Sequence, residues 1–192
     1  MPELENIAAA KHRNILSGDL FYHATKRRKL ESIVTYGLLS PTYAQRIGVT
    51  IDVEFPGSSL PDFVYLSKSA DQRKENTFFI TTATSSFLHP GFVVVLLSRE
   101  GVLVEKARPW SDPEGMFSLD EVMTKDFVQQ GSLVGFAVAT EVFPRVVNKN
   151  EEMILDAIRR AYSNNPELAV PLYDQIGNII WPDKLNNHLY PK

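Results

Sequence analysis

The stretch Phe21-Tyr22-His23-Ala24-Thr25, followed by Ile33 and then by Tyr36-Gly37-Leu38-Leu39-Ser40, carries the strongest signal in the chain. A short β-type run ends in a His-x-Thr pattern, and a helical segment then leads to Gly37, a favoured helix C-cap. Side chains two residues apart on a strand lie on the same side, so His23 and Thr25 should project together at a strand-to-helix corner. An imidazole and a hydroxyl placed there suit a small polar ligand, although a helix N-cap threonine beside a surface histidine explains the same pattern.

The composition indicates one folded domain and excludes several classes of site. The chain has 192 residues, 44% of them hydrophobic and 10% aromatic, which is enough for a real core. It contains no cysteine, so disulfides, thiol nucleophiles and thiolate zinc sites are excluded. A net charge of −3 gives no global attraction to nucleic acid. Without a signal segment or an apolar run of membrane-spanning length, we expect a cytoplasmic protein with no membrane contact, and export as an effector would leave no readable signal.

The order of elements predicts an α+β fold in a single domain over residues 1–192. We expect a core at about 20–140, a C-terminal helix and hairpin at 148–192, and a long functional loop at 41–62. The helix has Asn150 as a predicted N-cap. The expected helices cover residues 4–16, 26–36 and 150–163, the expected strands cover 20–25, 63–67, 92–97, 102–104, 121–124 and 133–138, and the expected hairpin covers 168–181.

Tyr65 is the second candidate site residue. It lies in the strand-like run Phe63-Val64-Tyr65-Leu66-Ser67 and combines an aromatic ring with a polar tip. A core tyrosine whose hydroxyl reaches a backbone carbonyl is the structural alternative.

Glu121 is the third candidate. A carboxylate just before the short apolar strand Val122-Met123 would stand at a sheet edge, where it can orient a ribose hydroxyl and stabilise positive charge. Ser118 and Glu121 also have the spacing of a capping box, which would make Glu121 the cap of a helix running to Gln130. Glu141, Glu152 and Glu167 also stand near apolar segments and remain alternative carboxylates.

Taken together, the three features resemble the ADP-ribosyltransferase superfamily, in the branch with a His-Tyr-Glu active site. The opening phrase through Ser40 is similar to that of DarT-type toxins and tRNA 2′-phosphotransferases. The run from Val64 to Asp71 resembles the second motif, a strand tyrosine followed by Ser and a short helix. The run from Asp120 to Thr124 resembles the third motif. Tyr22 and Tyr65 stand where a 2′-phosphotransferase is expected to have Arg and His, which argues against RNA-repair chemistry.

This resemblance implies a split β-sheet with flanking helices and NAD-dependent ADP-ribose transfer without a metal. It assigns charge stabilisation at the reacting ribose to Glu121, binding of the adenosine-side ribose or the diphosphate to His23, and nicotinamide stacking to Tyr65. Ala24 would bind the nicotinamide amide through its backbone, Thr25 would fix the strand corner, and Ser67 would be a further NAD contact. The likeness to toxins also implies a cognate antitoxin or inhibitor as a partner.

The acceptor stays open between protein and nucleic acid. The basic cluster Lys26-Arg27-Arg28-Lys29 directly follows the His-x-Thr pattern and would neutralise either the NAD diphosphate or acceptor phosphates, unless it is a solvated helix turn. Two other functions fit the sequence. One is a non-catalytic NAD or ADP-ribose binding module, and the other is a protein-interaction domain that uses the C-terminal hairpin as its contact surface.

Overall fold

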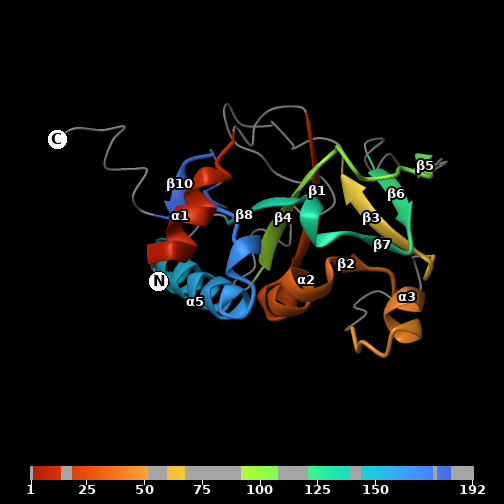
Figure 1. Ribbon diagram of the computed structural model, residues 1–192, viewed down its shortest axis with the longest axis horizontal. Helices are drawn as coiled ribbons and strands as arrows, with labels where there is room; N and C mark the ends of the chain where they lie inside the picture. Colours follow the sequence, from red (N-terminus) through yellow and green to blue (C-terminus); the bar gives the residue numbers. More distant parts are fainter. Residues whose placement is uncertain are drawn as a thin grey trace.

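The computed structural model describes residues 2–13, 19–51, 60–67, 92–107, 121–138, 144–174 and 177–182. These residues form an α+β fold, as the sequence predicts. Most of its strands join one mixed but mainly antiparallel sheet (Figure 1). Within the described ranges, no helix has both the length and the apolar character needed to cross a membrane.

The sheet has eight strands in the order β10-β9-β8-β4-β1-β3-β6-β5. Every neighbouring pair is antiparallel except β8 and β9, which run parallel. A small second sheet pairs β2 with β7. The strands are β1 (Leu20–Lys26), β2 (Leu38–Leu39), β3 (Phe63–Ser67), β4 (Phe92–Ser98), β5 (Lys106–Ala107), β6 (Glu121–Lys125), β7 (Phe127–Val128), β8 (Leu133–Ala137), β9 (Leu172–Tyr173) and β10 (Ile179–Trp181).

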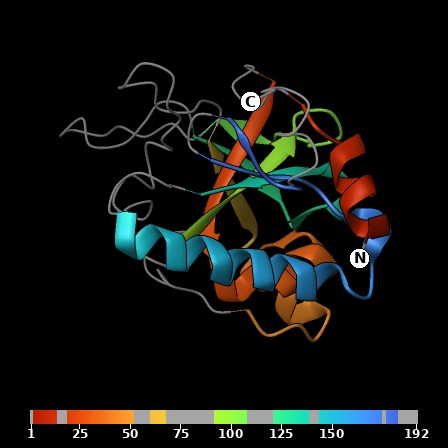
Figure 2. The same ribbon diagram turned by 90° about the vertical axis from the view of Figure 1, so that its left-hand side faces the viewer.

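Two helices cover one face of the sheet and enclose the core. In Figure 2, α5 runs beneath the sheet beside α2, and α1 lies at the end of the molecule near β10. Apolar side chains of α2 and α5 pack into one buried cluster with alternate residues of β1, β3 and β4. The helices are α1 (Pro2–Ala10), α2 (Leu30–Tyr36), α3 (Pro41–Arg46) and α5 (Pro144–Tyr162), with short 3-10 turns η1 (Arg27–Lys29), η3 (Gln130–Ser132) and η4 (Pro166–Leu168).

The sheet is divided between β1 and β3. On its other side β1 pairs with β4 along its whole length, from Leu20 opposite Ser98 to Lys26 opposite Phe92. Between β1 and β3, by contrast, the only described pair is Tyr22 opposite Ser67. The two strands therefore meet at one end and separate toward the other, which is the split sheet that the family resemblance implies.

Gly37 fixes the turn from α2 into β2. Its φ of 81° lies in the left-handed region, and its N–H donates to the Ile33 carbonyl at 2.8 Å. A Cβ at this position would collide with the Val128 carbonyl of β7. Gly37 is thus the C-cap that the sequence predicts, and the close approach of β7 makes the position unsuitable for other residues.

Several elements differ from the sequence prediction. The predicted loop at 41–62 contains α3, because the Ser40 hydroxyl accepts from the Tyr43 N–H at 3.2 Å and Pro41 occupies the first helical turn. Asn150 lies inside α5 and is not an N-cap. The segment 102–104 forms no strand, and Leu103 is 82% exposed.

The segment that begins at Glu121 is a strand and not the alternative capped helix. Val122 and Thr124 of β6 are buried and pair with β3. Asp126 then ends the strand with a φ of 61°, which is incompatible with a right-handed helix running to Gln130.

Candidate functional site

His23 bridges the split in the sheet. Its Nδ1 lies 2.9 Å from the carbonyl oxygen of Tyr65 on β3, so the ring N–H donates to that carbonyl. The bond crosses from β1 to β3 just beyond the single Tyr22–Ser67 pair. It fixes the orientation of the imidazole ring at the point where the strands separate.

The surroundings keep the His23 imidazole neutral. Burial lowers the pKa of His23 below its usual range, and the nearby Lys29 ammonium lowers it further, against the opposing effect of the Tyr65 hydrogen bond. A neutral imidazole that donates from Nδ1 carries a lone pair on Nε2. Nε2 is therefore a hydrogen-bond acceptor suited to a hydroxyl group rather than to a phosphate oxygen.

His23 and Thr25 together line a cavity of about 280 Å³ between β1 and α2. This placement confirms that they project to the same side of the strand. Lys29, Ser32 and Ile33 face them at helical i, i+3, i+4 spacing. The remaining lining residues are Arg28, Gly37, Leu38, Leu39, Thr50 and Ile51.

Two residues of the basic cluster, Arg28 and Lys29, belong to this cavity. The cluster is not the first turn of an α-helix, because Lys26 ends β1 and the other three residues form η1. Ser32, Thr50 and Ile51 were not singled out from the sequence. The spacing of Lys29 and Ser32 was a readable signal, whereas Thr50 and Ile51 reach the cavity only through the tertiary fold.

The Tyr65 side chain does not join His23 in the cavity. Val64 and Leu66 on either side of it belong to the core beneath the sheet, as does Phe21 on β1. Strand alternation therefore places Tyr65 on the opposite face of the sheet from His23. Its hydroxyl accepts the Leu60 N–H, while its backbone carbonyl holds the His23 ring.

Two further predicted residues, Ser67 and Glu121, stand in one row across the sheet with Tyr22. Tyr22 lies opposite Ser67, and Ser67 lies opposite Glu121, the first residue of β6. The three sequence motifs thus occupy the neighbouring strands β1, β3 and β6. Ala24, one residue beyond His23, is partly buried and pairs with Val94 of β4.

The alternative glutamates lie elsewhere or outside the described residues. Glu152 lies in α5 beneath the sheet, and Glu167 lies in the exposed turn η4, where its carbonyl accepts from Lys11 Nζ at 2.7 Å. Glu141 and the short helix expected after Ser67 lie outside the described residues. Of the described candidates, Glu121 is the one on a strand adjacent to β3.

Comparison with solved structures identifies the architecture. A Thermosipho africanus DarTG chain in complex with ADP-ribose superposes with a TM-score of 0.50 at 12% identity, covering 82% of this chain. The fold is that of a DarT-type ADP-ribosyltransferase. The match spans 50% of the DarTG chain, so this protein covers about half the length of that relative.

Two further DarT-type structures, both from Thermus sp. 2.9, were also found. The DarT complex with carba-NAD+ has a TM-score of 0.48 and 16% identity, covering 82% of this chain and 95% of that one. The complex with NAD+ has a TM-score of 0.48 and 13% identity, covering 83% and 96%. No protein-family model and no curated protein matches the sequence.

The C-terminal hairpin is part of this fold. Leu172, Tyr173, Ile179 and Trp181 are all buried, and β9 extends the main sheet beside β8. These four side chains, which the sequence offered as part of a contact surface, are therefore core residues, whereas Ile180 between them is partly exposed. Among the described side chains, no three His, Asp or Glu groups gather in a way that could hold a metal ion.

Proposed function

We propose that this protein transfers ADP-ribose from NAD to a macromolecular acceptor. The observation that carries the proposal is the neutral His23 imidazole, held by the Tyr65 carbonyl in a cavity that Arg28 and Lys29 also line. The DarT-type fold supports it independently. A toxin- or effector-like role, with a cognate antitoxin or inhibitor as a partner, extends the same proposal.

The described residues fit part of an NAD molecule. His23 Nε2 can accept a hydrogen bond from a ribose hydroxyl, and the Arg28 and Lys29 side chains suit a diphosphate. The volume of about 280 Å³ lies just below the range of about 300–1,000 Å³ that is usual for ligand pockets, so the cavity would enclose only part of the dinucleotide. His23 is accordingly assigned to the adenosine-side ribose.

The chemistry at the other end of NAD is assigned to Glu121. The bond between ribose C1 and the nicotinamide nitrogen breaks, nicotinamide leaves with the bonding electrons, and positive charge develops on the ribose. A carboxylate near that ribose stabilises the charge, as in glycoside cleavage. The acceptor nucleophile then forms the new bond to C1 and loses its proton. Tyr65, Ala24, Thr25 and Ser67 are assigned to positioning NAD along β1 and β3.

A non-catalytic NAD or ADP-ribose binding module is the second candidate. The cavity contacts of His23, Arg28 and Lys29 account for binding by themselves, whereas turnover depends on Glu121. A binding module would show saturable thermal protection by NAD without nicotinamide release. An enzyme would show both.

The acceptor is tested by incubating the protein with NAD labelled in its adenylate part and a crude lysate. The products are then divided between nuclease and protease treatment. Label that becomes small after one treatment only identifies that class of macromolecule as the acceptor. Label that is already of low molecular weight before either treatment would show plain hydrolysis or a small-molecule acceptor, and the macromolecular proposal would be abandoned.

A further inference from the structure

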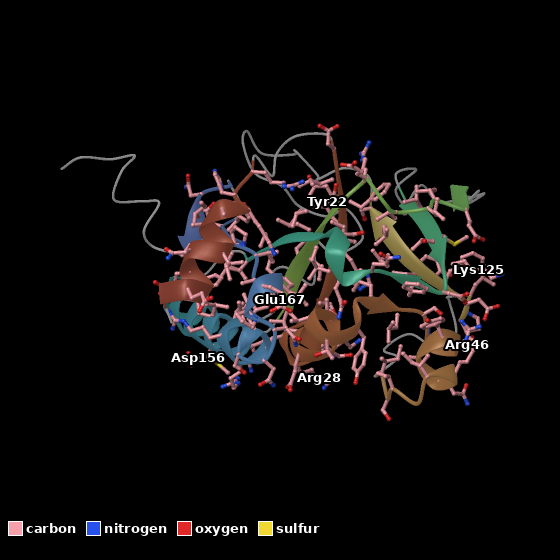
Figure 3. All side chains as sticks on the ribbon, in the orientation of Figure 1. Tyr22, Arg28, Arg46, Lys125, Asp156 and Glu167 are labelled. Atoms are coloured by element: carbon pink, nitrogen blue, oxygen red, sulfur yellow. The ribbon has the colours of Figure 1, made fainter. Side chains whose placement is uncertain are left out.

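A second recess lies at the opposite end of β1 from the His23 cavity. It has a volume of about 630 Å³ and is formed by the segment after α1, the start of β1 and the end of β4. The recess is lined by Leu20, the first residue of β1, whereas the His23 cavity is lined by Arg28, which is labelled below the lower end of β1 in Figure 3. The proposed function uses no residue of this recess.

Contacts with the folded core hold the basic residues of the recess in place. Arg99 donates from Nε to the Leu20 carbonyl at 3.3 Å, and its guanidinium lies 5.2 Å from the centre of the Phe21 ring. These two contacts fix the plane of the guanidinium. A planar guanidinium that is already oriented loses little entropy when it binds an oxyanion in a bidentate way.

The segment after α1 is anchored in the same way. The buried Tyr173 hydroxyl accepts the Arg13 N–H at 3.2 Å and lies 3.3 Å from His12 Nδ1. Lys11 donates from Nζ to the Glu167 carbonyl at 2.7 Å. Burial lowers the pKa of Lys11, although Glu167 opposes the shift, so this ammonium has lost part of its hydration and would gain from an anionic partner.

The charges around the recess define the chemistry of a ligand. Lys11, Arg13 and Arg99 supply three positive charges, and Asp19 and Glu100 supply two negative ones. A simple anion would be attracted by the three cations and repelled by the two carboxylates. A phosphate ester with hydroxyl groups satisfies both sets, because the cations take the phosphate and the carboxylates accept from the hydroxyls. The volume falls within the usual range of about 300–1,000 Å³ for small-molecule sites.

We propose that this recess binds a phosphate ester that carries free hydroxyl groups, with a mononucleotide unit as the class that fits its size and charges. The ligand would be either a free nucleotide or one nucleotide of a nucleic acid. Both sources share the chemistry that the recess recognises.

The position of the recess relates it to the proposed reaction. Neighbouring strands here are antiparallel, so the starts of β1 and β6 lie at the same end of the sheet as the ends of β3 and β4. Leu20, which lines the recess, is two residues along β1 from Tyr22. Glu121 is two strands across the sheet from Tyr22, through Ser67 of β3. With about 3.3 Å per residue and about 4.8 Å per strand, the recess begins on the order of 10 Å from the Glu121 backbone. A ligand there would lie at the same end of the sheet as Glu121, and any part it takes in the reaction rests on the proposed function.

Calorimetric titration with uridine monophosphate tests the site, since this probe lacks the adenine of NAD. The titration is run with and without saturating ADP-ribose, and uridine, inorganic phosphate and a uridine trinucleotide are the comparison probes. We expect saturable binding of uridine monophosphate that is unaffected by ADP-ribose and tighter than that of uridine or phosphate alone. Tighter binding of the trinucleotide would assign the ligand to nucleic acid, and weaker binding would assign it to free nucleotides.

Four variants locate the binding. Arg13→Gln leaves the backbone contact with Tyr173 intact and should weaken binding about tenfold through the loss of one charge-assisted contact, as should Lys11→Gln. Arg99→Lys keeps the charge but loses the planar fork, and it should also weaken binding. Arg160→Gln on the exposed face of α5 is the matched charge control and should have no effect.

Three results would overturn the proposal. They are the absence of saturable binding, equal affinity for phosphate and uridine monophosphate, and binding that competes with ADP-ribose while Arg13→Gln leaves it unchanged. If the protein binds uridine monophosphate but not ADP-ribose, the proposal for the recess stands and the proposed function is refuted instead. The two failures are thus distinguishable.

Discussion

Replacing His23 with phenylalanine tests the contact that joins the two halves of the sheet. The substitution keeps a ring of similar shape but removes the Nδ1 donor that reaches the Tyr65 carbonyl at 2.9 Å. A partly buried acceptor that loses its donor costs about 1–3 kcal/mol of unfolding free energy. In a protein of this size each kcal/mol shifts the melting temperature by about 2–4 °C, so we expect a decrease of about 2–12 °C.

Urea unfolding followed by fluorescence and circular dichroism measures this change as a lower midpoint with an unchanged slope. Thr35→Ala is the control, because it removes only the exposed local bond from Thr35 to the Glu31 carbonyl and should change stability by about 0.5 kcal/mol or less. If His23→Phe were no more destabilising than Thr35→Ala, the bridge across the split would contribute nothing to stability. The reasoning about His23 would then be refuted.

Two further predictions concern pH and backbone geometry. The pKa of His23 is lowered in the folded protein, so as pH falls below its usual value of about 6.5 the unfolded chain takes up this proton first. The His23 contribution to unfolding free energy should therefore be level above about pH 6.5 and decline below it. His23→Gln should flatten that decline in urea titrations at several pH values, and an unchanged slope would contradict the assignment. Gly37→Ala should cost about 2–4 kcal/mol, because an alanine would have a φ of 81° and a Cβ against the Val128 carbonyl. Gly131→Ala, where a Cβ meets open space, is its matched control, and similar losses at both sites would argue against the collision.

Local sequence signals predicted much of the fold. The run from Phe92 to Leu97 is apolar throughout, as expected of a central strand, and β4 indeed lies between β1 and β8 with its described side chains buried from Val93 to Leu97. Gly37 predicted the end of α2 correctly, because the C-cap position has a positive φ that glycine adopts readily. The α3 helix was missed although Ser40 and Pro41 form a readable start signal, because the prolines and glycines further along the segment outweighed it.

The site was harder to predict, because its geometry depends on contacts between distant segments. Alternation along β3 was readable from the sequence, but the face that Tyr65 occupies relative to His23 depends on the pairing of Tyr22 with Ser67. The contact of Tyr65 with His23 is made by its backbone carbonyl, and no pattern of side chains can predict such a contact. Glu121 fitted the predicted strand but also the alternative capped helix, and burial of Val122 and Thr124 against β3 decided for the strand.

The assignment of Glu121 as the residue needed for turnover is tested most directly by measuring nicotinamide release and NAD affinity in matched Glu→Gln variants. Glu121→Gln keeps the shape of the side chain but removes the charge that we propose stabilises the developing positive ribose, so the loss should fall on rate. We expect wild-type protein to release nicotinamide and Glu121→Gln to lose this activity while its NAD affinity stays within a few-fold. Glu152→Gln and Glu167→Gln should remain active. Loss of activity in either of these two with retention in Glu121→Gln would contradict the account, as would the absence of both NAD binding and nicotinamide release in the wild type.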